Sequence, residues 1–559
     1  MGLLLLFTVA MAVVFRQWLP HLGEALIGPP EDNLQDFWNT WYVAAGRQPG
    51  QPFFFTDLLR FPEGAPLHLH SFAYPKVFAI ALLTRIVGAD MGTLVLLQNL
   101  SILASFPLAG VGAFLLARQL GGSRAGALLG GFVFAFNPSH VAHAMHHAGV
   151  SSIEAIPFFV LCYLLATERR GRAFLLLAIA LYALSALSSW YYLVYLASFI
   201  AFHTLYAAVR ERRLPGGWRL AVAVACPVAV VAVLAPMLVP MTHAAAQAAP
   251  PAADGTGLYA ADLAGLAAFP RIHALAPLAD GVYRQLKGNA WESTVYLGLA
   301  NLALLSWACL SRRARPAPVL TYALCGMGTF CIVAAGSRLQ VLGHAAIPLP
   351  GAALSPLPLL SLMQAPARAI ALVYLFLAIA VAEAARAIWQ QGGGLRRAAV
   401  AGVAAIAVLD YLPVRALAMT PLSCPAGLEA IRDDPETGFG VLDLPPHGYA
   451  ERNFYMAQQA CHGRPIVLGN TSRRAGPTLG DRLDTWTVEA QRAQLAAARI
   501  KYVVLRSQST ADHGPVWMRA RPDERLRFAW RAEDAPPASY AAVYRVVYES
   551  PDLAIFRVY

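Results

Sequence analysis

Charged side chains are scarce in this chain: they make up 13% of its 559 residues, while 57% of the residues are hydrophobic. A soluble domain carries about 25% charged residues. This composition and a mean hydropathy of +0.50 therefore exclude an ordinary soluble fold. The apolar residues gather in runs long enough to cross a bilayer. We predict a mostly α-helical, polytopic membrane protein.

Several familiar motifs are also missing. The sequence has no Walker A motif, no dinucleotide-binding fingerprint and no HExxH motif, so ATP-driven transport and zinc proteolysis have no support. Its seven cysteines show no CxxC or metal-binding spacing. Five of them lie in apolar runs, where cysteine acts as a small hydrophobe. The other two, Cys424 and Cys461, are candidates for a disulfide if their region lies in an oxidising compartment.

Eleven apolar runs are long enough to span the bilayer once tilt is allowed for. They are 2–19, 93–117, 122–139, 152–168, 172–188, 190–208, 218–240, 291–311, 317–336, 367–388 and 398–417. The first run lacks a charged leader region and a clear cleavage site, so we expect it to be retained. The run Val77–Val87 is too short to span and contains Arg85, which favours an interfacial helix.

The net charge of +11 comes from arginines in short clusters between these runs. That is the pattern of cytoplasmic loops, and it requires no nucleic-acid partner. The clusters are Arg169, Arg170 and Arg172; Arg210, Arg212 and Arg213; Arg312, Arg313 and Arg315; and Arg396 and Arg397. With a cytoplasmic N-terminus, every cluster falls at the inner face. The loops 20–92, 241–290 and 337–366 and the tail from 418 onward then share the outer face.

The tail has a different character from the rest of the chain. It is richer in charge and contains short β-like runs at 439–444, 501–505 and 554–559, with helical periodicity over Thr487–Arg499. We predict a transmembrane domain at 1–417 and a soluble extracytoplasmic α/β domain at 418–559, a usual size for one domain.

Three carboxylates follow the first apolar run, at Glu31, Asp32 and Asp36. Ionisable groups near lipid are costly and are usually functional. Asp32 and Asp36 would share one face of a helix and could supply a general base that takes a proton from a hydroxyl group. The alternative is structural, because Asp32 is also a suitable N-cap for a helix beginning there.

Four histidines lie close together between the apolar runs 122–139 and 152–168, in a short loop that also falls on the outer face. They are His140, His143, His146 and His147. The first, second and fourth share a helical face, and imidazole suits several transition metals. A metal site with His143 and His147 as ligands is one interpretation. Polar lining that hydrogen-bonds a substrate is the other.

Four cationic side chains on the predicted outer face could bind phosphate groups. Arg271, Arg284 and Lys287 lie in the loop 241–290, and Arg368 begins a later span. These side chains suit either the phosphate of a donor or anionic lipid headgroups.

Taken in order, several segments resemble the GT-C superfamily of integral-membrane glycosyltransferases, in particular bacterial multi-spanning proteins with a YfhO-like layout. They are Asp32-Asn33-Leu34-Gln35-Asp36-Phe37-Trp38; Phe61-Pro62-Glu63-Gly64; Phe136-Asn137-Pro138 with the histidines and Glu154; Ser188-Ser189-Trp190; Glu292-Ser293-Thr294; Ala365-Pro366-Ala367-Arg368; and Val441-Leu442-Asp443. The acids of this chain depart from the family pattern, because they are spaced as Glu-Asp-x-x-x-Asp and are not a simple adjacent pair.

The resemblance implies an inverting transfer from a polyprenyl-phosphate sugar donor to a glycan, lipid or protein acceptor, with Asp32 or Asp36 as base. It also implies a bacterial inner (cytoplasmic) membrane protein with a periplasmic C-terminal domain, and it leaves open a divalent metal, Mg or Mn. We assign Arg271, Arg284, Lys287 and Arg368 to the donor phosphate. The candidate substrate-binding residues are Glu31, His68, His70, His143, His146, His147, Glu154 and Glu292.

Two other functions are compatible with a polytopic chain. One is a transporter or flippase of a lipid-linked glycan, which would favour internal repeats and paired broken helices; the sequence shows no repeat. The other is a non-catalytic assembly protein of the cell envelope.

Overall fold

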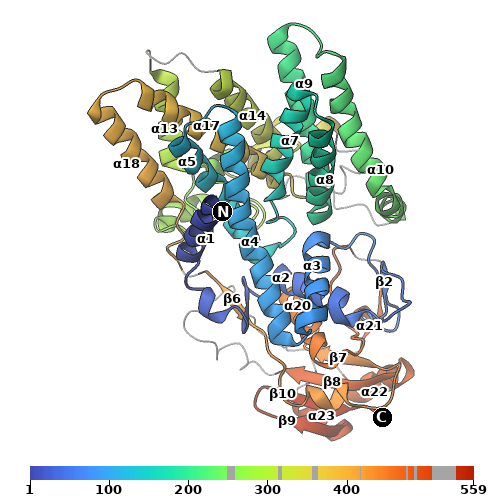
Figure 1. Cartoon of the computed structure of the whole chain (residues 1–559). Coiled ribbons are helices and arrows are strands. Elements are labelled where there is room, and N and C mark those ends of the chain that lie inside the picture. Colours follow the sequence, from blue (N-terminus) through green and yellow to red (C-terminus); the bar gives the residue numbers. More distant parts are fainter. Residues whose placement is uncertain are drawn as a thin grey trace. The chain divides into compact units, whose positions relative to one another are not determined.

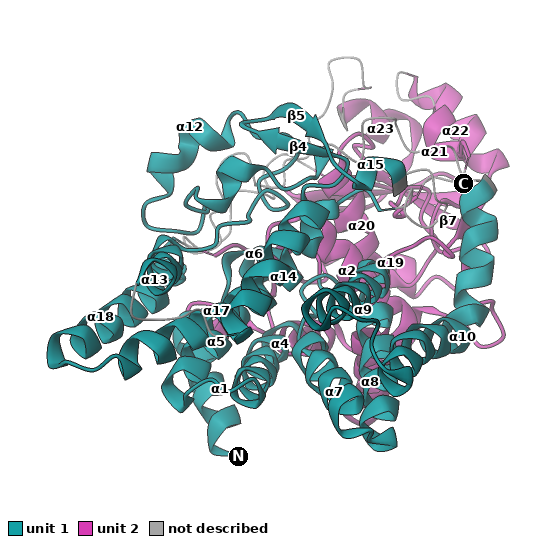
Figure 2. Ribbon diagram, turned by 90° about the horizontal axis from the view of Figure 1, so that it is seen from above, with its two compact units in different colours: residues 1–16, 102–144, 148–415 teal, residues 17–101, 145–147, 416–559 magenta. Residues whose placement is uncertain are grey.

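The computed structural model describes residues 1–247, 258–311, 318–354, 363–415, 417–473, 476–483, 487–506, 535 and 537–559. The arginine cluster at 312–315 lies outside the described residues. The chain divides into two compact units, whose elements are labelled in Figure 1 and which are coloured separately in Figure 2. Unit 1 comprises Met1–Arg16, Ile102–Ala144 and Ala148–Arg415, and unit 2 comprises Gln17–Ser101, Met145–His147 and Ala416–Tyr559.

Unit 1 is built mainly of apolar helices. Its long elements are α1 (Gly2–Val14), α5 (Arg124–Ala135), α7 (Ala155–Arg169), α8 (Arg172–Ser188), α9 (Trp190–Glu211), α10 (Gly217–Gln247), α13 (Leu299–Leu310), α14 (Pro318–Ala334), α17 (Ile370–Gln390) and α18 (Gly394–Asp410). The helices α4 (Met91–Gln119) and α6 (Pro138–His146) contribute residues to both units. The short elements are η3 (Leu263–Leu266), η4 (Ala276–Ala279), α12 (Asp280–Tyr283), β4 (Arg338–Val341), β5 (His344–Pro348), α15 (Gly351–Leu354) and η5 (Pro366–Ala369).

Among the described residues, four helices are long and apolar enough to cross a membrane: Met91–Gln119, Trp190–Glu211, Gly217–Ala246 and Pro366–Gln390. Four shorter apolar helices, α1, α8, α13 and α14, accompany them. These helices agree with the predicted helical membrane fold. The number of eleven spans stays a prediction.

Helix α17 lies at the centre of unit 1, packed against α5, α13 and α14. Its contact with α5 is close, because a Cβ atom added at Gly130 would lie 2.6 Å from the carbonyl oxygen of Ala378. Only a residue without a side chain allows this approach. Small residues at such positions let two apolar helices pack backbone to backbone within a membrane.

Two of the predicted runs differ from the helices observed. The run 122–139 is two helices, because α5 ends before Phe136 and Pro138 begins α6; proline has no N–H to continue a helix. The run 291–311 is helical only from Leu299, since residues 289–295 form turns in which Ser293 N donates to Asn289 O and Thr294 N donates to Trp291 O.

Unit 2 combines short helices with a small sheet. Its helical elements are η1 (Leu19–His21), α2 (Asp32–Trp41), η2 (Tyr42–Gly46), α3 (Tyr74–Val87), α19 (Leu428–Arg432), α20 (Tyr449–His462), α21 (Leu479–Arg482), α22 (Val488–Ala497) and α23 (Pro537–Val543). Its strands are β1 (Ala25–Ile27), β2 (Phe55–Thr56), β3 (Ala65–Pro66), β6 (Met419–Pro421), β7 (Gly440–Leu444), β8 (Ile500–Arg506), β9 (Arg545–Glu549) and β10 (Leu553–Arg557).

The described residues of the tail form a four-stranded sheet in the order β7-β8-β10-β9. Strands β7 and β8 are parallel, with Leu442 opposite Val503, and β10 is antiparallel to both β8 and β9. Every residue of β7 and β8 is buried, as is usual for strands covered on both faces. The three predicted strands and the predicted helix before β8 are all present.

The segment 17–101 packs in the same unit as the tail. Strand β1 pairs with β6, and α2 packs against α20, where Trp38 Nε1 donates to Gln459 Oε1 at 2.8 Å. Cys424 and Cys461 are joined by a disulfide, with their Cα atoms 5.4 Å apart. The segment 17–101 and the tail thus form one compact body, and the domain boundary at residue 417 stays a prediction.

Candidate functional site

The site in unit 2 is built around the first residues of α2. Two prolines, Pro29 and Pro30, precede Glu31, which is the N-cap residue, and Asp32 is the first residue of the helix. No side chain caps this helix end, so the capping interpretation of Asp32 is wrong. Its carboxylate still lies in the first turn, where the helix dipole favours a negative charge.

The chain before α2 is held from both sides. Asn33 Nδ2 donates to the carbonyl oxygen of Ile27 at 3.2 Å, and Asn33 Oδ1 accepts from the backbone N–H of Glu31 at 3.0 Å. Asn453 of α20 donates through Nδ2 to the carbonyl oxygen of Glu31 at 3.1 Å. These bonds fix the backbone that carries Glu31 and Asp32.

Gly28 lets a second segment approach these acids. Its φ of +107° lies in a region that favours glycine, and a Cβ atom there would lie only 1.8 Å from the carbonyl oxygen of Met145. The residues directly after Met145 are His146 and His147. Their side chains reach the two acids at the start of α2.

Asp32 is held by two partners. Its Oδ2 lies 2.9 Å from His147 Nε2, and its Oδ1 accepts a hydrogen bond of 2.5 Å from the hydroxyl group of Tyr449 in α20. Burial raises the pKa of the Asp32 carboxyl, but the hydrogen bond and charge of His147, together with the Tyr449 hydroxyl, outweigh burial and lower it to about 2. The side chain is 29% exposed. Asp32 is therefore an ionised acid that a substrate can reach.

Glu31 forms the second acid–histidine pair, with Oε2 3.0 Å from His146 Nδ1. The carboxylate is 44% exposed, whereas the His146 side chain is 1% exposed. Burial lowers the pKa of His146, although the hydrogen bond to Glu31 opposes the shift. The neutral imidazole therefore prevails, and its Nδ1–H donates to the carboxylate.

His70 is a buried neutral histidine on the same unit. Its Nδ1 accepts from the backbone N–H of Ser472 at 3.2 Å, which leaves Nε2–H to donate to Asn39 Oδ1 at 2.7 Å. Burial lowers the pKa of His70 to about 4, with the charge of Asp32 opposing. The imidazole is a fixed hydrogen-bonding element that joins α2 to the tail.

A second carboxylate centre lies in unit 1. Glu292 is 3% exposed and accepts from Arg368 at Oε1, with Arg368 Nε at 2.9 Å and Nη2 closer still. The Arg368 guanidinium also lies 4.7 Å from the centre of the Tyr191 ring, and His143 Nε2 is 3.9 Å from Glu292 Oε2. This is a buried ion pair with a histidine beside it.

The remaining predicted site residues are divided between the two units. Asp36 lies one turn beyond Asp32 on α2, half-buried, and His68 stacks on Phe54. Glu154 is the residue before α7. In the loop 241–290, Arg271 is half-buried, while Arg284 and Lys287 are exposed. The predicted metal ligands His143 and His147 belong to different units.

The sequence matches one family model, that of a domain of unknown function, DUF6311, over residues 48–411. This match covers more than half of the chain. The chain belongs to the DUF6311 family. A comparison with curated proteins finds no match.

The fold of this DUF6311 chain is similar to those of solved membrane glycosyltransferases. The arabinofuranosyltransferase AftD from Mycobacteria matches with a TM-score of 0.57 and 14% identity, over 99% of this chain and 41% of AftD. The oligosaccharyltransferase AglB from Archaeoglobus fulgidus, in complex with an inhibitory peptide and a dolichol-phosphate, matches with a TM-score of 0.51 and 12% identity, over 90% of this chain and 69% of AglB. A further AglB structure, a complex with Zn and sulfate, matches with a TM-score of 0.51 and 12% identity, over 90% of this chain and 68% of AglB. These matches confirm the GT-C fold expected from the sequence.

Sequence reasoning missed the residues that the tail contributes to the site. Tyr449 bonds Asp32, Asn453 bonds the backbone of Glu31, and Ser472 bonds His70. Tyr449 and Asn453 are four residues apart, so they share a face of α20. That polar stripe is visible in the sequence, but nothing in the sequence pairs it with residues more than 400 positions earlier.

Proposed function

We propose that this chain is a glycosyltransferase that moves a sugar from a polyprenyl-phosphate-linked donor to an extracytoplasmic glycan, lipid or protein, with inversion. The observation that carries the proposal is the ionised, reachable Asp32 held by His147 and Tyr449 at the start of α2. The GT-C fold supports it, and so does the dolichol-phosphate bound in the AglB complex.

In this reaction Asp32 receives the proton of the acceptor hydroxyl. The acceptor oxygen bonds to the anomeric carbon while the bond from that carbon to the phosphate oxygen breaks, and the polyprenyl phosphate leaves with the electron pair. A carboxylate with a pKa of about 2 is a weak base toward a resting hydroxyl. The hydroxyl becomes acidic as its oxygen bonds to carbon, so the carboxylate accepts the proton late while orienting the nucleophile from the start. One base acting in a direct displacement gives inversion.

The leaving phosphate needs a cation. Arg271, Arg284 and Lys287 remain our proposed phosphate-binding residues, because a half-buried arginine and two exposed cations are accessible to a headgroup. Arg368 suits this role less, since its guanidinium already binds the Glu292 carboxylate.

A divalent metal ion remains part of the proposal. The ion expected is Mg²⁺ or Mn²⁺, and His143 and His147 stay the proposed ligands. Imidazole ligands suit Mn²⁺ better than Mg²⁺, which prefers oxygen ligands and water. A bound ion would supply charge for the departing phosphate.

We place the chain in the bacterial inner membrane with eleven spans, a cytoplasmic N-terminus and a periplasmic tail from residue 418. The arginine clusters support this orientation. The disulfide between Cys424 and Cys461 supports an oxidising compartment for the tail.

The test is transfer of a labelled sugar from polyprenyl phosphate by membranes containing each variant, with mass spectrometry of the envelope glycans as product analysis. Asp32→Asn should slow transfer about 100- to 10,000-fold, and Asp36→Asn should reduce it less. Asp57→Asn is the matched control, because Asp57 is an exposed acid of the same loop. Unchanged transfer in both Asp32→Asn and Asp36→Asn would refute a base in this loop. Glycan that crosses the membrane without any new glycosidic bond would indicate a flippase.

A further inference from the structure

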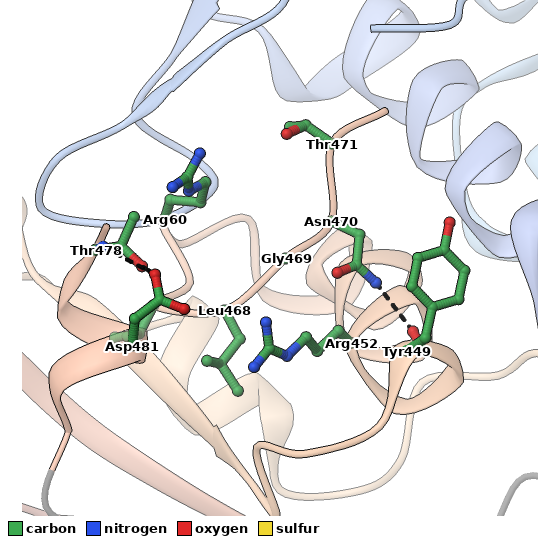
Figure 3. A pocket seen from close by; sticks show the side chains of 11 residues that line it. Arg60, Tyr449, Arg452, Leu468, Gly469, Asn470, Thr471, Thr478 and Asp481 are labelled. Carbon is green, nitrogen blue, oxygen red and sulfur yellow. Dashed lines mark hydrogen bonds between the residues drawn. The ribbon is translucent and has the colours of Figure 1, made fainter. Parts of the chain in front are cut away.

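A short segment of the tail, residues 469–472, bonds to the elements that surround Asp32 in unit 2. Figure 3 shows its second residue, Asn470, on the wall of a polar pocket of about 130 Å³, with its side-chain amide directed at Tyr449. Asn470 belongs to neither acid–histidine pair. Its bonds show how the tail acts on the proposed base without touching it.

Asn470 binds one face of α20. Its Nδ2 donates one hydrogen to the carbonyl oxygen of Tyr449 at 3.0 Å and the other to Asn453 Oδ1 at 2.9 Å. Its backbone N–H donates to the sulfur of Met456 at 3.1 Å. These three partners are spaced by four and three residues along the helix, so they share a face. A carbonyl oxygen can only accept, and this fixes the orientation of the Asn470 amide.

Asn470 also binds α2. Its carbonyl oxygen accepts from Nε2 of the buried Gln35 at 3.0 Å. Asn453 adds a second link, because its Nδ2 donates to the carbonyl oxygen of Glu31 while its Oδ1 accepts from Asn470. Asn453 is itself fully buried. Asn470 therefore joins the first turns of α2 and α20.

The helices joined in this way carry the two ends of the bond between Tyr449 and Asp32. Tyr449 is the first residue of α20, and Asp32 is the first residue of α2. No side chain caps either of these two helices, so capping does not fix where the two residues meet. A hydrogen bond weakens steeply once its geometry is distorted. The 2.5 Å bond therefore needs a support that holds the two helix starts together, and Asn470 supplies one.

The segment is anchored on both sides of Asn470. Gly469 has a φ of +145°, in a region that favours glycine. Beyond Asn470, the backbone N–H of Ser472 donates to His70 Nδ1 at 3.2 Å, and the Ser472 hydroxyl oxygen accepts from the backbone N–H of Ser71 at 3.0 Å. These bonds set the position of the Asn470 amide.

We propose that Asn470 is a positioning residue for the Asp32 base. It holds the first turn of α20 against α2, so that the Tyr449 hydroxyl stays bonded to Asp32 and turns the carboxylate toward the acceptor hydroxyl. The inference rests on the proposed transfer reaction, in which Asp32 is the base. It gives the tail a part in that reaction, exerted through Tyr449.

The first test compares Asn470→Ala with the unchanged full chain in lipid nanodiscs. The substitution removes both side-chain bonds and leaves the backbone bonds to Gln35 and Met456 in place. We expect kcat for sugar transfer to fall about tenfold with the donor KM unchanged, since a hydrogen bond to a charged group is weakened. Thr471→Ala is the matched control and should keep the full rate, because the Thr471 hydroxyl donates to Arg473 O within the segment. An unchanged kcat in Asn470→Ala would overturn the proposal.

Asn470→Asp separates the hydrogen bonds of the amide from its volume. The variant keeps the shape but places an oxygen atom against the Tyr449 carbonyl, so kcat should fall at least as far as in Asn470→Ala. Thermal unfolding in the same nanodiscs checks that both variants are folded. A normal rate in Asn470→Asp would overturn the proposal, because an ionised aspartate has no side-chain donor.

A double-variant cycle identifies the route of the effect. If Asn470 acts through Tyr449, Asn470→Ala has no aligned hydroxyl left to lose once Tyr449→Phe is present. The double variant should then turn over at about the rate of Tyr449→Phe alone. Two losses that multiply to about a hundredfold would show independent effects and overturn the proposal.

The pH dependence of kcat gives a readout that a general loss of packing would not move. The Tyr449 hydroxyl helps to lower the pKa of Asp32, so weakening its bond raises that pKa. The acid limb of the profile should therefore move to higher pH in Asn470→Ala, as it should in Tyr449→Phe. A lower kcat with an unmoved acid limb would assign Asn470 a purely structural role and overturn the proposal.

Failure of this proposal and failure of the proposed function give different results. If Asp32→Asn transfers sugar normally, Asp32 is not the base and Asn470 has no base to position. If Asp32→Asn is slow but Asn470→Ala transfers normally, the base stands and only the positioning role is refuted.

Discussion

The two carboxylate centres of this chain are built on different principles. Asp32 in unit 2 is 29% exposed and is held by an imidazole and a phenol, whereas Glu292 in unit 1 is 3% exposed and is held by a guanidinium. Imidazole and phenol each hold one carboxylate oxygen of Asp32 by a hydrogen bond and leave the acid accessible, whereas the guanidinium places a permanent positive charge beside Glu292. The comparison teaches that burial alone does not distinguish the two acids; the chemistry of their partners does.

The largest expected effect is on catalysis at the Asp32 centre. Asp32→Asn should slow transfer about 100- to 10,000-fold, the contribution typical of general base catalysis. Its thermal midpoint should stay close to that of the unchanged protein, because the amide still fits beside Tyr449. Turnover measured beside thermal unfolding in detergent separates the two effects. If Asp32→Asn transfers sugar at a rate within tenfold of the unchanged protein, Asp32 is not the base, and the proposed difference between the Asp32 and Glu292 centres is refuted.

The Glu292 centre should respond in the opposite way. Arg368→Met leaves a buried carboxylate without its cation, which costs about 3–5 kcal/mol of stability. Adding Glu292→Gln to Arg368→Met should recover part of this lost stability, because the unpaired charge is removed. Unfolding by denaturant in mixed micelles measures the stability of the single and the double variant. The exposed pair Arg432–Asp433 is the control, and Asp433→Asn should change stability little. If Arg368→Met is stable but inactive, the role of Arg368 is in binding the donor and not in stabilising the fold.

The buried His70 should make the stability of the protein depend on pH. Its pKa is about 4 when folded, against an unperturbed value of about 6.5, so the unfolded chain binds the proton more readily. Stability should therefore fall as pH decreases from about 6.5 to 4, by up to about 3 kcal/mol. His70→Gln should flatten this dependence in unfolding experiments. His68→Gln, at the half-buried neighbour, should leave it unchanged.

The smallest effect should come from Tyr449→Phe. Removing one hydrogen bond to an ionised group should slow transfer about tenfold without unfolding the protein. Tyr455→Phe on the same helix is the matched control, because its hydroxyl group donates to Pro445 O at 2.8 Å and not to an acid. Equal rates for the two variants would mean that Tyr449 does not tune Asp32.

Sequence periodicity predicts much of the fold and less of the site. Apolar runs located the helices because burial from water acts locally along the chain. They misjudged residues 291–298, which we included in a span but which are not helical: 291–293 form turns at the buried Glu292, and the helix begins only at Leu299. The acids at the start of α2 were visible in the sequence, and so were the histidines that meet them.

The tail's contribution to the site could not be predicted in this way. Tyr449 and Asp32 are 417 positions apart, and their bond depends on the packing of α2 against α20. A single sequence carries no record of which distant faces pack together. The N-cap interpretation of Asp32 was wrong for a related reason, since the prolines before Glu31 and the bonds to Asn33 and Asn453 decide where the helix begins.

Gly28 illustrates a constraint that no inventory of reactive groups would detect. The carbonyl oxygen of Met145 occupies the space that any side chain at position 28 would need, so the two acid–histidine pairs depend on a volume being left empty. In a saturation library, position 28 should tolerate no replacement, alanine included, although glycine contributes no proton, charge or hydrogen-bonding side chain. Function at this position is lost by adding atoms, whereas at Asp32 it is lost by exchanging them.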